Sequence, residues 1–338
     1  MSTIREVAKL ANVSTATVSR IINNDTKYKI TDATRERVWD AVRALNYSIP
    51  VKAPKNSKEA PVQNTPHKVG CILSVTKKKY NDPYFMSIFS GIEKRLQEKG
   101  CVISFIKTGA ELDDRNALVS LFQEPIAGMI MMETLNPETF EYVSSHVPHL
   151  VGIDTMQGNI DNVGYDHYQA ALLTTRYLIE RGHKKIGFVG GSGGPADLMN
   201  SRRYQGYYIA MSSAGLTVED KWTLNCQWDE DLCAAQVDKL CASGDMPTAI
   251  VAASDLMAIV TMNSLFRNGL SVPSDVAVIG ISNIDMSKYT TPPLTTVHIP
   301  TEEIGIAAAD ILLSRINGNN LLPQRVLLPI SLVIRDSV

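Results

Sequence analysis

This chain lacks the features of a membrane-bound or secreted protein. It contains no run of about 18 apolar residues, the length that a membrane-spanning helix needs, although 44% of its 338 residues are hydrophobic. The segment Met1–Glu6 lacks the apolar core of a secretory signal, so we expect a cytoplasmic protein with no membrane partner. The length allows more than one domain and a large core.

Cysteine is scarce, and its spacing argues against two kinds of site. The five cysteines include no C-x-x-C pair, and their odd number disfavours a disulfide framework as well as a zinc site. Cys226, Cys233 and Cys241 are close in sequence, which would suit a redox switch, but buried thiols are the usual outcome. The six histidines show no metal-ligand spacing, so we expect neither a metal nor a cofactor.

Positive charge is concentrated at one end of the chain. The first 58 residues carry 11 Lys and Arg against 5 Asp and Glu, whereas the remaining residues carry 22 against 30. A basic segment joined to an acidic body is typical of a module that binds phosphates attached to a domain that does not. The net charge of −2 for the whole chain conceals this asymmetry.

The basic segment begins with two short amphipathic helices. Thr3 and Glu6 form a capping box for the first, Ser14 is a suitable N-cap for the second, and Asn12 suits the turn between them. A third helix is expected over 32–45. The apolar faces of the first two helices pack together only if the helices cross steeply, which predicts a helix-turn-helix. A two-helix corner of an ordinary domain is the alternative. The residues that form these two faces are Ile4, Val7, Ala8, Ala11, Val18, Ile21 and Ile22.

Segments of strand length alternate with amphipathic helices from Val69 onward. Unbroken apolar strands separated by helices indicate parallel sheets covered on both faces. The pattern predicts an all-α helix-turn-helix head followed by an α/β body of two doubly wound parallel-sheet subdomains. The stretch 48–68, which is rich in proline, lysine and asparagine, has the composition of a linker. Strands are expected at 69–75, 101–106, 128–132, 149–153, 185–189, 249–252, 276–281 and 295–299, and helices at 85–99, 169–181, 203–214, 231–242 and 255–268.

The motifs of the head are specific enough to indicate a family. The segment 3–23, with Thr31 to Trp39 and Leu45-Asn46-Tyr47, closely resembles the lactose-repressor/galactose-repressor family of bacterial transcription regulators. The resemblance extends over nearly the whole chain. It implies that the body resembles periplasmic sugar-binding proteins. Similarity to the galactosidase-operon repressors rests on Asn81-Asp82-Pro83-Tyr84, on Val251 to Asp255 and on Tyr289 to Val297.

The resemblance implies a domain division and a set of DNA contacts. The head is 1–47, the hinge 48–68 and the effector-binding and dimerisation domain 69–338, with lobes of about 69–167 with 298–326 and 168–297 with 327–338. Thr15, Ala16 and Arg20 match positions that read base edges, and Arg20 can contact guanine through two hydrogen bonds. The positions that match phosphate contacts, which fix register without reading sequence, are Thr3, Ser14, Thr17, Asn23 and Thr34.

The hinge departs from the family pattern. Family members usually carry a short helix there, with an Ala-Arg-x-Leu motif whose leucine inserts into the minor groove. Here the stretch 48–55 has no such leucine and contains Pro50 and Pro54, which disfavour a helix. Ile49 or Val51 could replace the wedge, but we favour a weakly helical hinge whose lysines contact the DNA backbone.

The effector site is expected at the carboxyl ends of the strands, where doubly wound folds bind ligands. A planar Arg and carboxylates can bind sugar hydroxyls, while an indole stacks on the apolar sugar face. The alternatives are structural: in them Asp255 caps a helix, Asp154 anchors a turn and Trp228 packs between lobes. Ser282-Asn283 stands where many relatives have an Asp, so these side chains can hydrogen-bond a sugar only without the added strength of a charge. The resemblance points to Asn81, Asp82, Pro83, Asp154, Arg203, Trp228, Ser254, Asp255, Ser282 and Asn283.

These observations together indicate a ligand-responsive repressor of carbohydrate-utilisation genes and not an enzyme. The motif G-x-S-x-G at 190–194 would suit a hydrolase, but Pro195 follows it and His298 lies in an expected strand. We expect a homodimer on a pseudo-palindromic double-stranded operator, released by a galactoside-like sugar. A regulator that uses a co-repressor and an exported sugar-binding transport protein are the alternatives.

Overall fold

A computed structural model describes residues 3–22, 30–45, 67–73, 82–112, 114–122, 124–132, 134–155, 157–191 and 198–338. Asn23, Asn81, the end of the G-x-S-x-G motif and the predicted hinge up to residue 66 lie outside these described residues. Internal contacts divide the chain into two units, residues 1–64 and 65–338. In the described part of the chain, no helix is both long and apolar enough to cross a membrane.

The first unit contains the three predicted helices, α1 (Ile4–Leu10), α2 (Thr15–Ile22) and α3 (Asp32–Ala44). Their apolar faces form a small core in which Val7, Val18 and Val38 are fully buried. The capping box is present: the Thr3 amide donates to Glu6 Oε2 at 2.6 Å, and the Glu6 amide donates to Thr3 Oγ1 at 3.4 Å. The predicted helix pair and its N-terminal cap are therefore confirmed.

The turn between α1 and α2 also follows from its residues. Asn12 has a φ of +53°, a left-handed conformation that asparagine tolerates better than most residues. Ser14 then begins α2, since its hydroxyl accepts the Thr17 amide at 3.1 Å. One buried face and one exposed face remain on α2, as the helix-turn-helix prediction requires.

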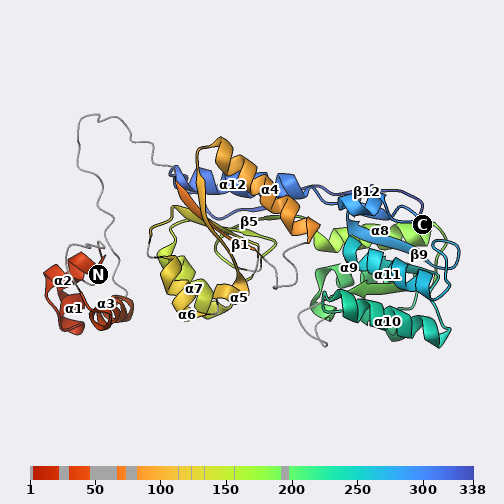
Figure 1. Cartoon of the computed structure of the whole chain (residues 1–338), viewed down its shortest axis with the longest axis horizontal. Helices are drawn as coiled ribbons and strands as arrows, with labels where there is room; N and C mark the ends of the chain where they lie inside the picture. Colours follow the sequence, from red (N-terminus) through yellow and green to blue (C-terminus); the bar gives the residue numbers. More distant parts are fainter. Residues whose placement is uncertain are drawn as a thin grey trace. The chain divides into compact units, whose positions relative to one another are not determined.

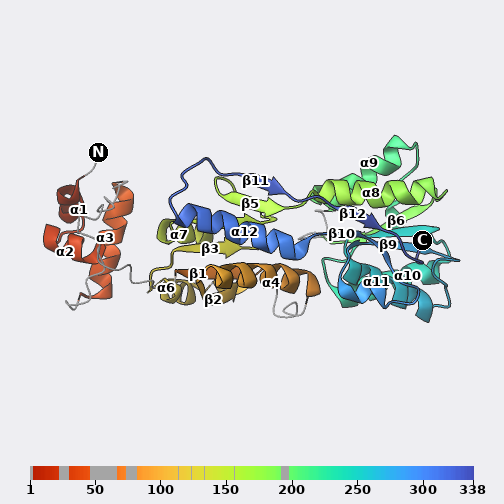
Figure 2. The ribbon, with the colours of Figure 1, turned by 90° about the horizontal axis from the view of Figure 1, so that it is seen from above.

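The second unit contains two six-stranded sheets (Figures 1 and 2). Sheet A, with its helices, forms lobe A. All of its strand pairs are parallel, in the order β11-β5-β4-β3-β1-β2. Helices α4 and α12 cover one face, and α5, α6 and α7 the other. The bounds are β1 Lys68–Leu73, α4 Pro83–Glu98, β2 Val102–Thr108, α5 Gly109–Leu112, α6 Arg115–Leu121, β3 Gly128–Met131, α7 Pro137–His146, β4 Leu150–Ile153, β5 Asp161–Gly164, α12 Thr301–Ile316 and β11 Arg325–Leu327.

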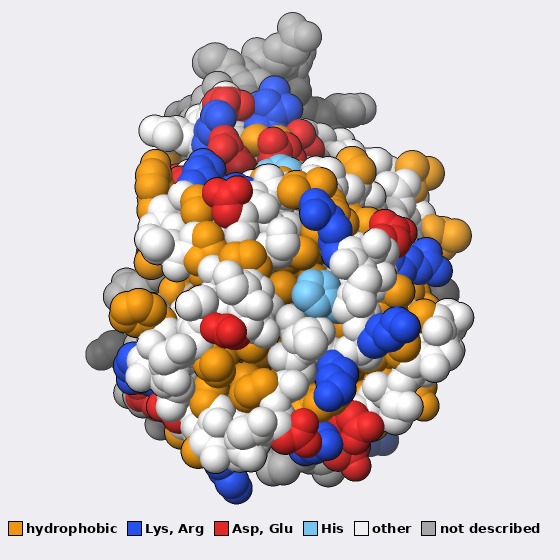
Figure 3. Space-filling view, turned by 90° about the vertical axis from the view of Figure 1, so that its right-hand side faces the viewer, with side chains coloured by type: hydrophobic (Ala, Val, Ile, Leu, Met, Phe, Trp, Pro, Cys, Tyr) orange, Lys and Arg blue, Asp and Glu red, His pale blue; other side chains and the backbone are white. Residues whose placement is uncertain are grey.

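Sheet B, with its helices, forms lobe B, in the order β12-β10-β9-β8-β6-β7. Helices α10 and α11 pack on one face, and α8 and α9 on the other. Figure 3 shows acidic and basic side chains interspersed with apolar ones on the face that it presents. The bounds are α8 His167–Glu180, β6 Ile186–Gly190, η1 Leu198–Asn200, α9 Arg202–Ser213, η2 Asp220–Trp222, β7 Thr223–Asn225, α10 Glu230–Ser243, β8 Ala249–Ala252, α11 Asp255–Arg267, β9 Ala277–Ser282, η3 Asp285–Lys288, β10 Thr295–His298 and β12 Ser331–Val333.

One strand departs from the expected parallel arrangement. β12 pairs antiparallel with β10, with Val297 opposite Leu332. The cause is the path of the chain, because β11 ends at the carboxyl edge of sheet A and only residues 328–330 separate it from β12. A strand that crosses directly between two facing carboxyl edges must enter the second sheet in the opposite direction. The chain makes two further crossings, after β5 and after β10.

Candidate functional site

The predicted base-reading residues lie on the outer side of α2. Thr15 and Ala16 are exposed, and Arg20 is half-buried. Val18 and Ile21 on the same helix are buried in the core of the head. Exposure at the first turn of a recognition helix is what contact with a base edge needs, and these three residues stay predictions.

The residues predicted to contact phosphates are polar groups near helix starts. Ser14 and Thr17 share a hydrogen bond of 2.9 Å, and Thr34 accepts one from Arg37 at 3.3 Å. Thr3 and Ser14 are exposed, whereas Thr17 and Thr34 are half-buried. The exposed basic residues Arg5, Lys9 and Arg37 add positive charge to the head.

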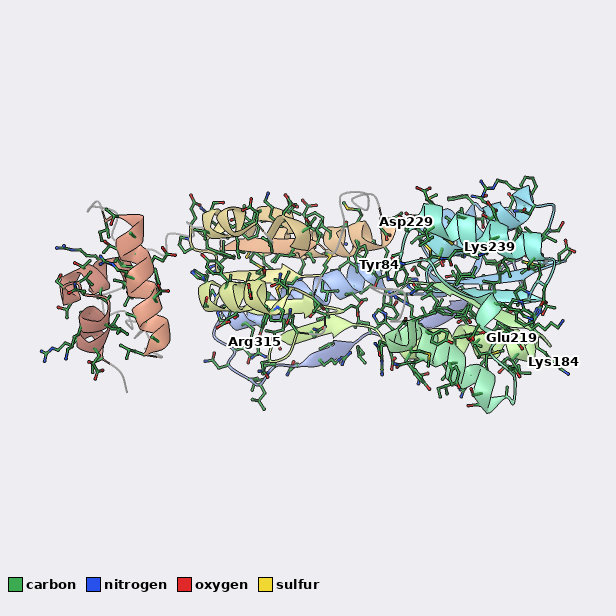
Figure 4. All side chains as sticks on the ribbon, turned by 90° about the horizontal axis from the view of Figure 1, so that it is seen from below. Tyr84, Lys184, Glu219, Asp229, Lys239 and Arg315 are labelled. Atoms are coloured by element: carbon green, nitrogen blue, oxygen red, sulfur yellow. The ribbon has the colours of Figure 1, made fainter. Side chains whose placement is uncertain are left out.

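A second candidate site forms where β4 and β5 end in lobe A and α9 begins in lobe B. Asp154, which follows β4, lies at its centre. The Tyr84 hydroxyl donates to Asp154 Oδ2 at 3.2 Å, and His167 Nε2 lies 3.0 Å from Asp154 Oδ1. Figure 4 shows Tyr84 at the end of lobe A that is nearer to lobe B. Each oxygen of the Asp154 carboxylate therefore already accepts a hydrogen bond from the protein.

Arg203 contributes the positive charge of this site. Its Nη2 donates to the Tyr165 hydroxyl at 2.5 Å, and its guanidinium carbon lies 5.2 Å from the centre of the Trp228 ring. Its Nε is buried and has no hydrogen-bond partner among the described residues. Tyr165 in turn stacks on His167, with ring centres 4.1 Å apart. The rings of Tyr165 and His167 thus connect Arg203 to Asp154.

Burial and neighbouring charges set the protonation of this cluster. Burial raises the pKa of Tyr84 well above its usual value, and the Asp154 carboxylate adds to the effect, so this hydroxyl keeps its proton. Burial and the charge of Arg203 lower the pKa of His167, and the neutral imidazole donates from Nε2 to Asp154. Burial alone would lower the pKa of Arg203, but Tyr165, Tyr84 and Asp154 raise it, and the guanidinium stays charged.

Two glycines make room for the predicted residues. Asp154 has a φ of +52°, and a Cβ on Gly164 would lie 1.9 Å from its Oδ1. A Cβ on Gly191 would lie 2.6 Å from the Trp228 ring. Larger residues at either position would displace the carboxylate or the indole, so both glycines are required by close approach.

The other residues predicted for the effector site have protein partners. Asp82 caps α4 by accepting the Tyr84 amide at 2.9 Å, and Pro83 follows it in the first helical turn. Ser254 caps α11 by accepting the Met257 amide at 3.2 Å. The alternative that Asp255 caps this helix is therefore wrong, because Ser254 holds that position.

Asp255, Ser282 and Asn283 belong to a separate polar cluster inside lobe B. Fully buried Asp255 accepts from the Thr296 hydroxyl at 2.5 Å and from the Ile284 amide at 2.9 Å. Burial raises its pKa to about 6. Asn283 accepts from Arg335 at 2.6 Å and contacts His298 at 3.2 Å, while buried Ser282 contacts the Ile281 carbonyl. Through Arg335, the Asn283 side chain links the C-terminal segment to sheet B.

The sequence prediction missed Tyr84, Tyr165 and His167. Tyr84 directly follows two predicted residues and adjoins them in the first turn of α4. Tyr165 and His167 follow β5, whose four residues Asp161–Gly164 include two polar ones and do not resemble a buried strand. Once β5 is known, the rule that ligands bind beyond carboxyl ends points to both.

A cavity in the described part of the chain lies away from the candidate effector site. It has a volume of about 530 Å³ and lies near the amino ends of β5 and β11, with Gln157, Asn159 and Gln324 in its lining. Beside it, Arg315 makes a buried bidentate ion pair with Asp161, at 2.7 and 2.8 Å. Figure 4 shows Arg315 farther from lobe B than Tyr84. The described residues include no group of three or more His, Cys, Asp or Glu side chains that could hold a metal ion.

Comparison with protein families identifies both parts of the chain. The family described as bacterial regulatory proteins, lacI family, matches residues 3–49, and the periplasmic binding protein-like domain matches residues 175–338. An HTH-type transcriptional repressor PurR of Aliivibrio salmonicida is 33% identical over 95% of this chain and 94% of its own length. The repressor PurR of Actinobacillus pleuropneumoniae serotype 3 is 32% identical over 100% of this chain and 98% of its own length.

Solved structures share the whole architecture. A complex of the transcriptional regulator CelR with cellobiose superposes with a TM-score of 0.73 at 26% identity and covers both chains completely. The lac repressor dimer bound to operator and the anti-inducer ONPF has a TM-score of 0.67 at 23% identity, covering 99% of this chain and 98% of its own, and shows the fold alone. A helix-turn-helix head joined to two parallel α/β lobes is therefore confirmed.

Proposed function

Because this chain belongs to the LacI family of bacterial regulatory proteins, we propose that it represses carbohydrate-utilisation genes and leaves its operator when a sugar binds. The chain is a ligand-responsive, DNA-binding transcription regulator and not an enzyme. Its place of action in this proposal is the cytoplasm, where the chromosome of a bacterium lies.

The head performs the DNA reading in this proposal. Exposed Thr15 and Ala16 with half-buried Arg20 contact base edges, and the hydroxyl groups at helix starts contact phosphates. Two copies of the chain present two heads to a pseudo-palindromic operator. The division into a head of 1–47, a hinge of 48–68 and an effector-binding body of 69–338 belongs to the same proposal.

One observation carries the effector part of the proposal. Arg203 combines a buried Nε that lacks a partner among the described residues with an indole 5.2 Å from its guanidinium carbon. A planar hydrogen-bond donor beside an aromatic face suits a ring with oxygens at its edge, which is the chemistry of a sugar. The complex of CelR, named as containing cellobiose, supports a carbohydrate for this fold.

The choice of a galactoside-like inducer rests on sequence motifs such as Asn81 to Tyr84 and Tyr289 to Val297. The relatives named above are repressors called PurR. They support membership of the family but not of the galactosidase-operon subgroup. A regulator that uses a co-repressor fits the same site with the opposite coupling between effector and DNA. A transport protein is disfavoured because it would not need the head.

Operator binding by the full-length chain tests the proposal. Operators are selected from a randomised duplex library and then measured by fluorescence anisotropy at several salt concentrations. We expect affinity to fall steeply with salt, because binding releases counterions from phosphates. A panel of galactosides, other sugars and purines is then titrated against the complex.

The outcomes separate the alternatives. Release of DNA by a sugar supports the proposal, tighter binding in the presence of a ligand indicates a co-repressor, and release by a purine alone contradicts the carbohydrate assignment. If the chain retains no duplex at low salt, the whole proposal fails.

A further inference from the structure

We propose that the cavity beside β5 and β11 is an additional ligand site, which binds a small anion that carries several hydroxyl groups, such as a sugar acid or a sugar phosphate. The residues that line it include none of those predicted for the effector site and none of the cluster around Asp154. The assignment therefore holds whichever effector binds between the lobes. Three features of the described residues support it: fixed walls, two carboxamide oxygens without donors, and one arginine without an anionic partner.

The cavity lies on one face of sheet A, where β5 and β11 pair. Asn162 in β5 is in register with Arg325 in β11, so these two side chains point to the same face of the sheet. Both residues line the cavity, whose volume is about 530 Å³. Small-molecule sites commonly enclose about 300–1,000 Å³, so the space accommodates a sugar ring with an anionic group.

Arg315 fixes the wall that Leu322, Pro323 and Gln324 form. Its Nη2 donates to the Leu322 carbonyl at 2.9 Å, while the same guanidinium pairs with buried Asp161. Asp161 Oδ1 also accepts the Gln324 backbone amide at 2.8 Å. A wall that the protein already holds in place does not have to be ordered when a ligand binds, which lowers the cost of binding.

The opposite wall is the loop between β4 and β5, and side-chain amides fix it. Asn159 turns the loop with a φ of +63°, a conformation that asparagine tolerates. Asn162 Nδ2 donates to the Thr155 carbonyl at 3.0 Å and to the Thr155 hydroxyl at 2.7 Å. Gln157 Nε2 donates to the Leu135 carbonyl at 2.7 Å.

The same hydrogen bonds determine which atoms of Asn162 and Gln157 are left for a ligand. A carbonyl oxygen can only accept, so both side chains must turn their nitrogen to the protein. In the described part of the chain, no donor bonds to Asn162 Oδ1 or to Gln157 Oε1. Two acceptors with fixed orientation therefore belong to the lining, and the hydroxyl groups of a ligand are suitable donors for them.

Arg325 supplies the charge of this site. It is exposed, and among the described residues its side chain has no hydrogen bond or ion pair. No Asp or Glu is among the described residues that line the cavity. A guanidinium binds a carboxylate or a phosphate through two parallel hydrogen bonds. Ile160 and Pro323 add apolar surface for the carbon skeleton of the ligand.

Isothermal titration calorimetry on the full-length chain tests the proposal with matched ligands. The pairs are gluconate with glucose, glucose 6-phosphate with glucose, and ribose 5-phosphate with ribose, and inorganic phosphate is a separate probe. Each titration is repeated on Arg203→Gln, because these ligands can also enter the effector site. We expect at least one of the three anions to bind both chains more tightly than its neutral partner does. The carboxylate and phosphate arms identify the source of the anion.

Two variants assign this binding to the cavity. Arg325→Gln should weaken the anion by about 10-fold or more, because a charge-assisted hydrogen bond is lost. Arg176→Gln is the matched control, since Arg176 is an exposed arginine of α8 that does not line the cavity. Gly158→Leu should also weaken the anion, because a Cβ there meets nothing within 4 Å and the added side chain fills open space. Circular dichroism shows whether each variant is folded.

Several results would overturn the proposal. It fails if Arg325→Gln weakens none of the anions, or if Arg176→Gln weakens them as much. Unchanged binding to Gly158→Leu would place the anion outside the cavity. Binding that folded Arg203→Gln loses and Arg325→Gln keeps would assign the anion to the effector site. The operator assay is independent of these titrations, because the chain can bind and release DNA while this cavity binds nothing.

Discussion

The head and the body of this regulator use their polar residues in opposite ways. In the head, the polar side chains assigned to DNA are at or near the surface, and their side-chain hydrogen bonds join residues three apart. In the body, Asp154, Arg203 and Asp255 bond to residues from distant parts of the chain. The role of a polar residue with local partners can be predicted from a motif. The role of a polar residue with distant partners can be assigned only when the fold shows those partners.

The largest effect should come from the buried ion pair of lobe A. Arg315→Gln leaves Asp161 without its cation, and we expect the free energy of unfolding to fall more than in any other variant proposed below. Lys94→Gln is the control, because its pair with Glu302 is largely exposed and should contribute little to stability. Urea denaturation measures both variants. Equal losses would show that burial does not distinguish these pairs.

Asp255 should make the stability of the body depend on pH. Burial raises its pKa from 3.8 to about 6, so the folded chain holds this proton more tightly than the unfolded chain. Its contribution to stability therefore falls as pH rises from about 4 to about 6, by on the order of 2–3 kcal/mol. Denaturation of the wild type and of Asp255→Asn at pH 4.5 and pH 7 shows how much the free energy of unfolding of each chain changes between these pH values. Parallel pH profiles would contradict the prediction.

Arg20→Ala should change DNA binding without a comparable loss of stability. We expect affinity to fall by about 1–3 kcal/mol and selectivity to relax at one base position, because a bidentate contact is lost. Lys9→Ala is the matched control, since it removes an exposed positive charge from α1 and should weaken all sequences equally. Binding to a randomised operator library distinguishes them. Identical operator-sequence preferences for Arg20→Ala and the wild type would show that Arg20 does not read a base.

The smallest effect should come from the cap of α1. Thr3→Ala removes the hydroxyl that accepts the Glu6 amide and should destabilise the helix by about 1 kcal/mol. Hydrogen exchange of the α1 amides in the full-length chain measures this loss, while exchange in lobe B serves as the internal control. Faster exchange throughout the chain would show that the cap acts on more than the head.

The sequence predicted the head and most of the sheets because their signals are local. Capping residues, helical periodicity and apolar strands identified α1, α2 and the central strands of both sheets. The short polar strand β5 and the edge strands β7, β11 and β12 were missed, since three or four residues with polar members carry little signal. The antiparallel direction of β12 depends on where a distant strand ends, which no local pattern contains.

The candidate site was predicted only in part for the same reason. Asp154, Arg203 and Trp228 do contribute to one polar cluster, but its other members follow elements that the pattern did not reveal. Asp255 and Asn283 have hydrogen-bond partners in β10 and the C-terminal segment, and Ser282 bonds to its neighbour Ile281. Their side chains are the expected chemical types, and only the tertiary partners show how they are used.

The crossings between the two sheets have a consequence for the order in which the chain can fold during synthesis. Lobe B draws five of its six strands from the stretch 186–298, so it is nearly complete once that stretch has emerged. Lobe A begins first but waits for α12 and β11, which are made more than a hundred residues after β5. Until then α4 is present but α12 is not, so this face of sheet A, which includes Ile130 and Val151, is only partly covered. The nascent chain therefore exposes the apolar surface of its older lobe while the younger one is already able to close.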